Sequence, residues 1–259
     1  MSIDVSAMLS LQGRTALVTG ASSGLGEHFA RVLAAAGARV AVGARRVERL
    51  DALVEELVAA GGEALAVPLD VSDAGSVTTA LATIEAHFGV ADVLINNAGV
   101  ADSRYCLKVD EASWDYIMDT NLKAVWRLAR DVAARCIAAD KPGAIVNIAS
   151  ILGLRVSFGE STYAVSKAAV VQMTKAMALE LARKNIRINA LCPGYFATEL
   201  NTGYLQSDQG QDMLSKTPAG RAGQLNELSA PLLLLASGAG SFINGATLAV
   251  DGGHLVSSL

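Results

Sequence analysis

The chain has 259 residues, of which 52% are hydrophobic and 18% are charged, so it is long and apolar enough to bury a substantial core. Its formal net charge of -4 argues against the broad basic surface that nucleic-acid binding requires. No run approaches the roughly 18 apolar residues of a membrane span, and residues 1–11 lack the pattern of a signal peptide. We therefore expect a soluble, cytoplasmic protein with no membrane or nucleic-acid partner.

Cysteine and histidine are scattered along the chain. Cys106, Cys136 and Cys192 form no C-x-x-C pair, which suits reduced thiols better than a disulfide framework. The histidines stand at no metal-ligand spacing, either from one another or from the cysteines. We therefore expect no metal site.

Short apolar runs alternate with helical patterns from one end of the chain to the other. The runs predict strands at residues 14–19, 39–43, 64–69, 92–95, 144–148, 186–191 and 246–250. Apolar residues recur at helical spacing between them, at residues 25–36, 47–58, 73–88, 112–139 with one break, 163–183 and 225–236. Pro231 is expected to kink the last helix or displace its start.

This alternation predicts the fold. Nearly continuous apolar strands between helices imply parallel pairing, with both faces of the sheet covered. We expect an α/β protein with a Rossmann-type, doubly wound parallel sheet of about seven strands. Residues 1–259 are expected to form a single domain, with a mobile substrate lid around residues 195–216, where the chain is polar.

A glycine-rich turn follows the first predicted strand. Thr19 to Gly26 reads Thr-Gly-Ala-Ser-Ser-Gly-Leu-Gly and opens the first helix, so backbone N–H groups and the helix dipole are placed to bind a pyrophosphate. Glycines also simply end strands, but this position favours a dinucleotide site. The cofactor-binding residues expected in this turn are Gly20, Ser22, Ser23, Gly24, Leu25 and Gly26.

The second predicted strand ends in two arginines. Dinucleotide folds that select an unphosphorylated ribose usually place an acid here, about 20 residues past the glycines. This chain instead has Arg45 and Arg46, whose planar N–H groups suit a phosphate. The sequence therefore predicts NADP(H) rather than NAD(H). The alternative is that both arginines are ordinary surface charges at the start of a helix.

A second group of residues carries acid–base chemistry. Tyr163 and Lys167 lie one helical turn apart, so the phenol and the ammonium share a helix face. An ammonium nearby stabilises the phenolate and is expected to lower the tyrosine pKa toward neutrality. Ser150 ends the fifth strand, at the same edge of the sheet, where its hydroxyl can hydrogen-bond a substrate oxygen.

Taken together, these residues resemble those of the short-chain dehydrogenase/reductase family. The resemblance runs from Thr19 to Gly253. Besides the residues above it includes Asp70, Asn96 to Gly99 (Asn-Asn-Ala-Gly), Asn121, Pro193, Gly194, Thr198 and the terminal Val250 to Gly253 (Val-Asp-Gly-Gly).

The resemblance implies a role for each of these residues. Tyr163 would exchange a proton with the reacting oxygen, Ser150 would orient that oxygen, and Lys167 would lower the tyrosine pKa and hold the nicotinamide ribose. Asn121 would hold a water that links the lysine to solvent. The remaining cofactor contacts implied are Asp70 and Val71 at the adenine, Asn97 and Gly99 along the cofactor, and Pro193, Gly194 and Thr198 at the nicotinamide.

The sequence thus predicts an NADP-dependent carbonyl reductase or alcohol dehydrogenase acting on a small-molecule ketone or secondary alcohol. Reduction of a 3-oxoacyl thioester and a non-catalytic cofactor-sensing module are the alternatives. The spacing of Tyr163 and Lys167 argues against enoyl reduction. Arg155 and Glu160 either contact a charged substrate or lie on the surface. The family is usually tetrameric, and the apolar residues 242–259 are expected to form a contact in a homotetramer.

Overall fold

The computed structural model describes residues 4–198 and 202–257. Seven strands form one parallel sheet in the order β3-β2-β1-β4-β5-β6-β7, which confirms the predicted fold. The strands are β1 (Thr15–Thr19), β2 (Arg39–Ala44), β3 (Glu63–Pro68), β4 (Val93–Asn96), β5 (Gly143–Ile148), β6 (Ile186–Pro193) and β7 (Thr247–Val250). The strand order reverses between β1 and β4, so a crevice opens at their carboxyl ends.

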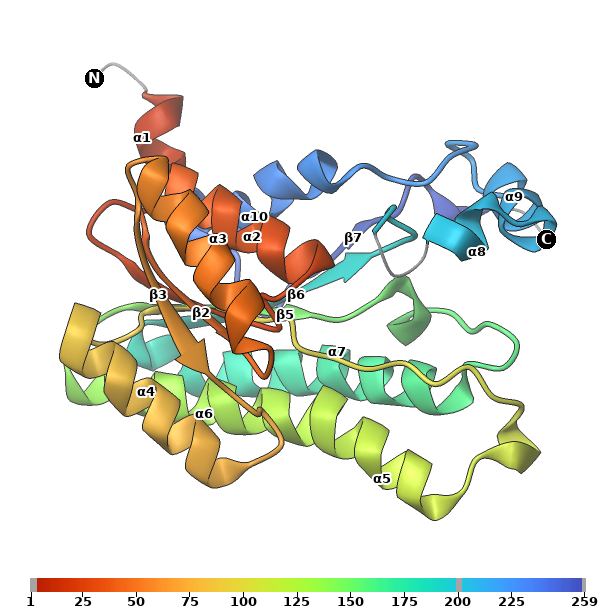
Figure 1. Ribbon diagram of the computed structural model, residues 1–259, viewed down its shortest axis with the longest axis horizontal. Coiled ribbons are helices and arrows are strands. Elements are labelled where there is room, and N and C mark those ends of the chain that lie inside the picture. Colours follow the sequence, from red (N-terminus) through yellow and green to blue (C-terminus); the bar gives the residue numbers. More distant parts are fainter. Residues whose placement is uncertain (1–3, 199–201, 258–259) are drawn as a thin grey trace.

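Helices cover both faces of the sheet (Figure 1). The α-helices are α1 (Val5–Leu9), α2 (Gly24–Ala35), α3 (Val47–Ala59), α4 (Ala74–Phe88), α5 (Glu111–Met118), α6 (Ala124–Ala138), α7 (Ser161–Leu181), α8 (Thr202–Gln206), α9 (Asp208–Ser215) and α10 (Ser229–Ala236). Helices α2, α3 and α10 pack on one face, and α4, α6 and α7 on the other. Neighbouring strand residues such as Leu17 and Val18 belong to the two different cores, because successive side chains point to opposite faces.

The sequence predicts one break in the helical pattern over residues 112–139, and the structure has a π-helical turn at that break. A π-helical turn, Asp119–Lys123, joins α5 to α6 without ending the helix. Such wide turns are rare and occur mainly at functional sites. Asn121 lies at its centre.

Pro231 displaces the start of the last helix. A 3-10 turn covers Leu225–Leu228, and α10 begins at Ser229, so the proline falls in the first turn, where its missing N–H is not needed. Within the predicted lid, α8 and α9 form helices that the sequence reasoning did not foresee.

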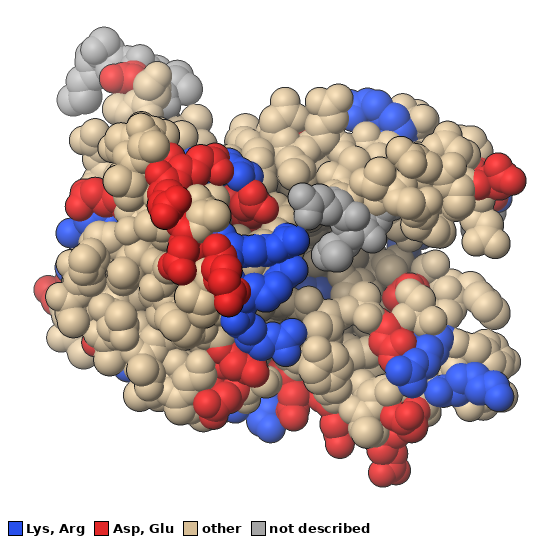
Figure 2. Space-filling model, viewed as in Figure 1, with Lys and Arg blue, Asp and Glu red and all other residues tan. Residues whose placement is uncertain are grey.

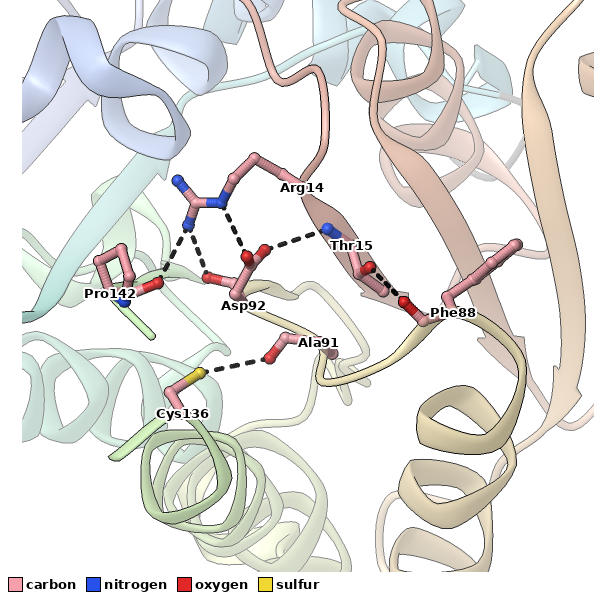
Figure 3. Close-up of polar contacts among 7 residues, drawn as sticks. All are labelled: Arg14, Thr15, Phe88, Ala91, Asp92, Cys136 and Pro142. Atoms are coloured by element: carbon pink, nitrogen blue, oxygen red, sulfur yellow. Dashed lines mark hydrogen bonds and ion pairs between the residues drawn. The ribbon is translucent and has the colours of Figure 1, made fainter. Parts of the chain in front are cut away.

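The edge of the sheet opposite the crevice is held by a buried polar cluster (Figure 3). Arg14 pairs with Asp92 at 3.0 Å and also donates to the Pro142 carbonyl at 3.3 Å. The other carboxylate oxygen of Asp92 accepts from the Thr15 backbone N–H at 3.0 Å. These contacts tie the starts of β1, β4 and β5 together, on the side of the sheet away from the crevice.

Candidate active site

A cavity of about 560 Å³ lies along the carboxyl ends of the central strands. Its lining includes most of the residues that the sequence singles out: Gly20, Ser22, Ser23, Gly24, Leu25, Arg45, Arg46, Asp70, Val71, Asn97, Gly99, Ser150, Tyr163, Lys167, Pro193, Gly194 and Thr198. Gly26 and Asn121 stand behind this lining. Tyr116, Thr120 and Phe196 also line the cavity, and the sequence reasoning did not single them out.

The glycine turn is closely packed against the loop after β4. Gly20 has a φ of +66°, and a Cβ there would lie 2.8 Å from the Cα of Ala98. A Cβ on Gly26 would lie 2.3 Å from the Gly20 carbonyl oxygen. Side chains at these two positions would push the start of α2 away from the sheet. Glycine therefore keeps the backbone N–H groups at the start of α2 beside the cavity.

Asn97 fixes the same turn from the other side. Its amide nitrogen donates to the carbonyl oxygens of Thr19 at 3.0 Å and Gly20 at 3.3 Å. The Thr19 hydroxyl in turn accepts from the backbone N–H groups of Asn97 and Ala98, each at 3.0 Å. The carboxyl ends of β1 and β4 are thus joined where the strand order reverses.

The two arginines after β2 lie at the far end of the cavity. Arg46 donates to the Ser22 hydroxyl at 2.9 Å and to the Ser23 hydroxyl at 2.9 Å. The positive charge of Arg45 helps to hold the pKa of Asp70 below its usual range, although the larger cause is the hydrogen bond from Ser72. Figure 2 shows basic side chains gathered in the middle of this view, beside a hollow in the surface. Exposed guanidinium groups next to a phosphate-binding turn fit the extra phosphate of NADP(H).

The loop after β3 is supported from α6. Arg127 donates to the carbonyl oxygens of Val71 at 3.2 Å and Ser72 at 2.9 Å. Asp70 accepts from both the backbone and the hydroxyl of Ser72, at 2.9 and 2.6 Å. These bonds fix the loop where the adenine is expected. The sequence reasoning missed Arg127, because an arginine within a helix carries no local signal of its target.

Asn121 is fully buried, and its side chain is already paired. Its amide oxygen accepts from the Val100 N–H at 2.8 Å, and its amide nitrogen donates to the Val100 carbonyl at 2.8 Å and to the Ser166 hydroxyl at 3.1 Å. The side chain therefore joins the π-helical turn to the loop after β4 and to α7. In this arrangement both N–H groups of the side-chain amide donate to protein.

Ser150, Tyr163 and Lys167 converge at the inner end of the cavity. Ser150 begins the 3-10 turn Ile151–Gly153, and its hydroxyl accepts from the Leu152 N–H at 3.1 Å. The same hydroxyl hydrogen-bonds the Tyr163 phenol. The Lys167 ammonium donates to the Ile148 carbonyl at 2.8 Å and lies 5.6 Å from the centre of the Tyr163 ring.

The expectation of a lowered phenol pKa is wrong for this structure. Burial raises the pKa of Tyr163 to about 12, and the hydrogen bond with Ser150 only partly opposes that effect. Burial also lowers the pKa of Lys167 to about 8, so its charge is lost above neutral pH. Both shifts follow from the poor solvation of charge inside the site. At neutral pH the phenol is protonated, which is the form that a proton donor needs.

The end of β6 brings the chain close to β7. A Cβ on Gly194 would lie 2.8 Å from the Cα of Asp251, so glycine is required at this contact. Cys192, just before, is fully buried, and burial raises the pKa of its thiol to about 11. A thiol of that pKa is a poor nucleophile.

Five side chains outside the cavity lining are connected to Tyr163 through Glu160 and Tyr195, and we call them the substrate rim: Arg155, Glu160, Tyr195, Tyr204 and His254. Burial is the main cause of the raised pKa of Tyr163, and Glu160 and Tyr195 lie close enough to add to it. The Tyr195 ring stacks on His254, with centroids 5.7 Å apart, and faces Tyr204 at 6.5 Å. The substrate rim therefore combines flat aromatic surfaces with charged groups.

Within residues 4–198 and 202–257, no helix is both apolar and long enough to cross a membrane. No group of three or more His, Cys, Asp or Glu side chains among them could hold a metal ion.

Known proteins match this chain over nearly its full length. A family model described as enoyl-(acyl carrier protein) reductase matches residues 20–254. A gluconate 5-dehydrogenase of Gluconobacter oxydans is 41% identical over 251 residues, which cover 96% of this chain and 98% of that protein. A 3-oxoacyl-[acyl-carrier-protein] reductase of Salmonella typhimurium is 36% identical over 245 residues, covering 95% of this chain and 98% of that protein.

Solved structures agree with these matches. The crystal structure of a gluconate 5-dehydrogenase from Burkholderia cenocepacia, in complex with NADP and tartrate, has a TM-score of 0.93 and 37% sequence identity to this chain. The match covers 99% of this chain and 100% of that one.

Proposed function

The chain belongs to the short-chain dehydrogenase/reductase family and is an oxidoreductase that transfers hydride between NADP(H) and a ketone or secondary alcohol; we propose that its substrate is a sugar acid. The observation that carries this proposal is the convergence of Ser150, Tyr163 and Lys167 beside a substrate rim with polar and charged groups. Relatives named for sugar-acid dehydrogenation, at 41% and 39% identity, support the choice of substrate.

In the proposed reaction Tyr163 is the general acid for ketone reduction and the general base for alcohol oxidation. Its raised pKa keeps the phenol protonated at neutral pH, ready to donate to the carbonyl oxygen. Ser150 hydrogen-bonds the same oxygen and stabilises the charge that develops on it. Lys167, held by the Ile148 carbonyl, supplies positive charge beside the phenol and donors for the nicotinamide ribose.

The cofactor is expected to lie along the cavity, with its hydride-carrying ring near Tyr163. When bound, NADPH supplies the hydride, and the protein contributes orientation and proton transfer. Arg45 and Arg46 would hold the 2′-phosphate, and the glycine turn the pyrophosphate. Pro193, Gly194 and Thr198 would bound the nicotinamide, and Asn121 would fix the π-helical turn behind it.

The first test follows NADPH formation with gluconate and other sugar acids, and its consumption with their keto forms. We expect turnover by the wild type and a fall of about 10²- to 10⁴-fold in kcat for Tyr163→Phe, which keeps the ring but removes the acid. Turnover by the wild type would exclude a cofactor-sensing module. Activity that survives Tyr163→Phe would remove that residue from the proposed role.

A second candidate is reduction of 3-oxoacyl thioesters. Large apolar side chains beside the substrate rim favour it, because an acyl chain could cover them: Leu107 is 80% exposed, Val156 82% and Phe158 88%. A 3-oxoacyl thioester offered next to the sugar acids separates the two candidates, since the preferred substrate has the higher kcat/KM.

We also propose that residues 195–216 close over the substrate and that residues 1–259 act as one domain. Tyr195 and Tyr204, whose rings face each other, would link this segment to the catalytic edge of the sheet. The lid can be tested by proteolysis with and without cofactor and substrate, which should protect α8 and α9 if they close.

A homotetramer is the oligomeric state that we propose. Exposed aromatic side chains on α5 and α6, Trp114 and Trp126, and the fully exposed Phe242 beside β7 provide apolar surface for two different contacts. Sedimentation at micromolar concentration tests this, and a monomer there would contradict it.

A further inference from the structure

Arg155 lies in the loop between two proposed catalytic residues, Ser150 and Tyr163. Its Nη1 atom donates to the His254 carbonyl oxygen and, at 3.2 Å, to the Ser257 hydroxyl. One nitrogen of the guanidinium group thus anchors the side chain to the C-terminal segment. The Nε and Nη2 atoms donate to no acceptor within residues 4–198 and 202–257.

The anchoring segment is itself well fixed. Both carboxylate oxygens of Asp251 accept backbone N–H groups, from Gly253 at 2.9 Å and Leu255 at 2.7 Å. The His254 ring stacks on Tyr195 with an angle of 25° between the planes. The guanidinium group of Arg155 is therefore held in place before a ligand arrives, which reduces the entropy lost on binding.

The charge of Arg155 acts on the substrate rim. Burial lowers the pKa of His254 and Arg155 lowers it further, whereas at Tyr195 the charge of Arg155 opposes the rise in pKa that burial causes. Tyr195 also lies within electrostatic range of Tyr163. Arg155 and Tyr163 are thus both neighbours of Tyr195, Arg155 through the His254 segment that stacks on the Tyr195 ring and Tyr163 within electrostatic range.

Two other charged groups at this entrance are already bound to protein. Arg104 pairs with Asp102 at 2.8 Å and approaches Asp110 at 3.7 Å. Glu160 accepts a hydrogen bond from the Ser103 hydroxyl. Arg155, in contrast, forms no ion pair with any carboxylate in the described part of the chain.

We propose that Arg155 binds the carboxylate of the substrate through Nε and Nη2, and so determines specificity for acids over neutral polyols. A guanidinium fork matches a carboxylate with two parallel hydrogen bonds. The Tyr195 hydroxyl is then left for the hydroxyl groups between the carboxylate and the reacting carbon. This inference rests on the proposed function and adds the residue that recognises the acid.

The experiment compares a sugar acid with its uncharged amide in four proteins: wild type, Arg155→Met, Arg155→Lys and the control Arg183→Met, which changes an exposed arginine just after the far end of α7. We expect Arg155→Met to raise KM for the acid about 10- to 100-fold, the effect of losing a hydrogen bond to a charged group, and to leave KM for the amide within threefold. Arg155→Lys should recover part of the affinity, and Arg183→Met should behave as wild type. Measurements of NADPH affinity and of the thermal unfolding temperature show whether the C-terminal segment keeps its structure in each variant.

The possible results distinguish failure of the Arg155 inference from failure of the proposed function. If the wild type oxidises acids but Arg155→Met raises KM for acid and amide equally, Arg155 only supports the C-terminal segment and the inference is wrong. An unchanged KM for the acid overturns it as well. A wild type that oxidises neutral alcohols but no hydroxy acid overturns both the inference and the proposed sugar-acid substrate.

Discussion

Cofactor preference gives the sharpest test of the arginines after β2. The variants are Arg45→Ala, Arg46→Ala and the double variant. Arg46 lies 2.9 Å from the hydroxyls of both Ser22 and Ser23, so its guanidinium group extends over the phosphate-binding turn. NADPH and NADH differ only in the 2′-phosphate, and NADH therefore serves as the internal control for any general damage.

The size of the effect follows from exposure. A hydrogen bond to a charged group contributes about 1.5–3 kcal/mol. Both arginines are exposed, so screening by water and salt places each near the lower limit. Since about 1.4 kcal/mol is a factor of ten, each single variant should raise KM for NADPH about tenfold. The double variant should reach about 100-fold if the two contacts are independent.

The assay measures kcat/KM with both cofactors at fixed substrate. KM for NADH should stay within threefold in every variant, because NADH lacks the 2′-phosphate that the two arginines are proposed to bind. The preference for NADPH should also weaken as salt is added. If the double variant keeps the wild-type ratio of kcat/KM for NADPH to kcat/KM for NADH, the two arginines are ordinary surface charges. The assignment of the 2′-phosphate site is then wrong.

Three further outcomes are expected. The rate of ketone reduction should decline as pH rises through about 8, because burial lowers the pKa of Lys167 to that value and the ammonium then loses its charge. Lys167→Arg should remove the decline, because arginine stays charged. An unchanged pH profile in this variant would mean that another group causes the decline. Arg14→Met should lower the free energy of unfolding, measured in urea, by about 2–3 kcal/mol, because the Asp92 carboxylate is only 5% exposed and loses its cation. The double variant Arg14→Met with Asp92→Asn should recover part of that free energy. Equal losses in the single and double variants would contradict the importance of the ion pair. Gly194→Ala should impair folding or cofactor affinity, because the added Cβ would lie only 2.8 Å from the Asp251 Cα. A wild-type melting temperature and cofactor affinity, both measured by calorimetry, would show that the chain after β7 moves aside freely.

The repeating strands and the glycine turn could be predicted because their signals are local. Apolar runs, glycines at fixed spacing and Tyr163 one turn before Lys167 are all visible in the sequence itself. The N-caps of two unforeseen helices are visible too: Asp4 accepts from the Ala7 N–H at the start of α1, and Ser207 from the Gly210 N–H at the start of α9. Attention to capping would have found both helices.

Other features depend on contacts between distant segments. Arg127 is recognisable only once α6 lies beside the loop after β3. The high pKa of Tyr163 arises from its depth in the folded protein, whereas spacing along a helix reports only the neighbouring charge. The position of Arg155 requires the C-terminal segment to fold back past Tyr195, over about a hundred intervening residues.

The π-helical turn at Asp119–Lys123 limits how this part of the protein can evolve. A π-helical turn is wound less tightly than an α-helix, so it takes in one extra residue while the helix on either side keeps nearly the same facing. Loss of that residue would leave Arg127 facing Val71 and Ser72, but it would tighten the turn around Asn121 and pull its amide away from Val100. A single deletion would thus damage the catalytic end of the cavity and spare the adenine end, and lineages that keep the Asn121 contact must inherit the extra residue with it.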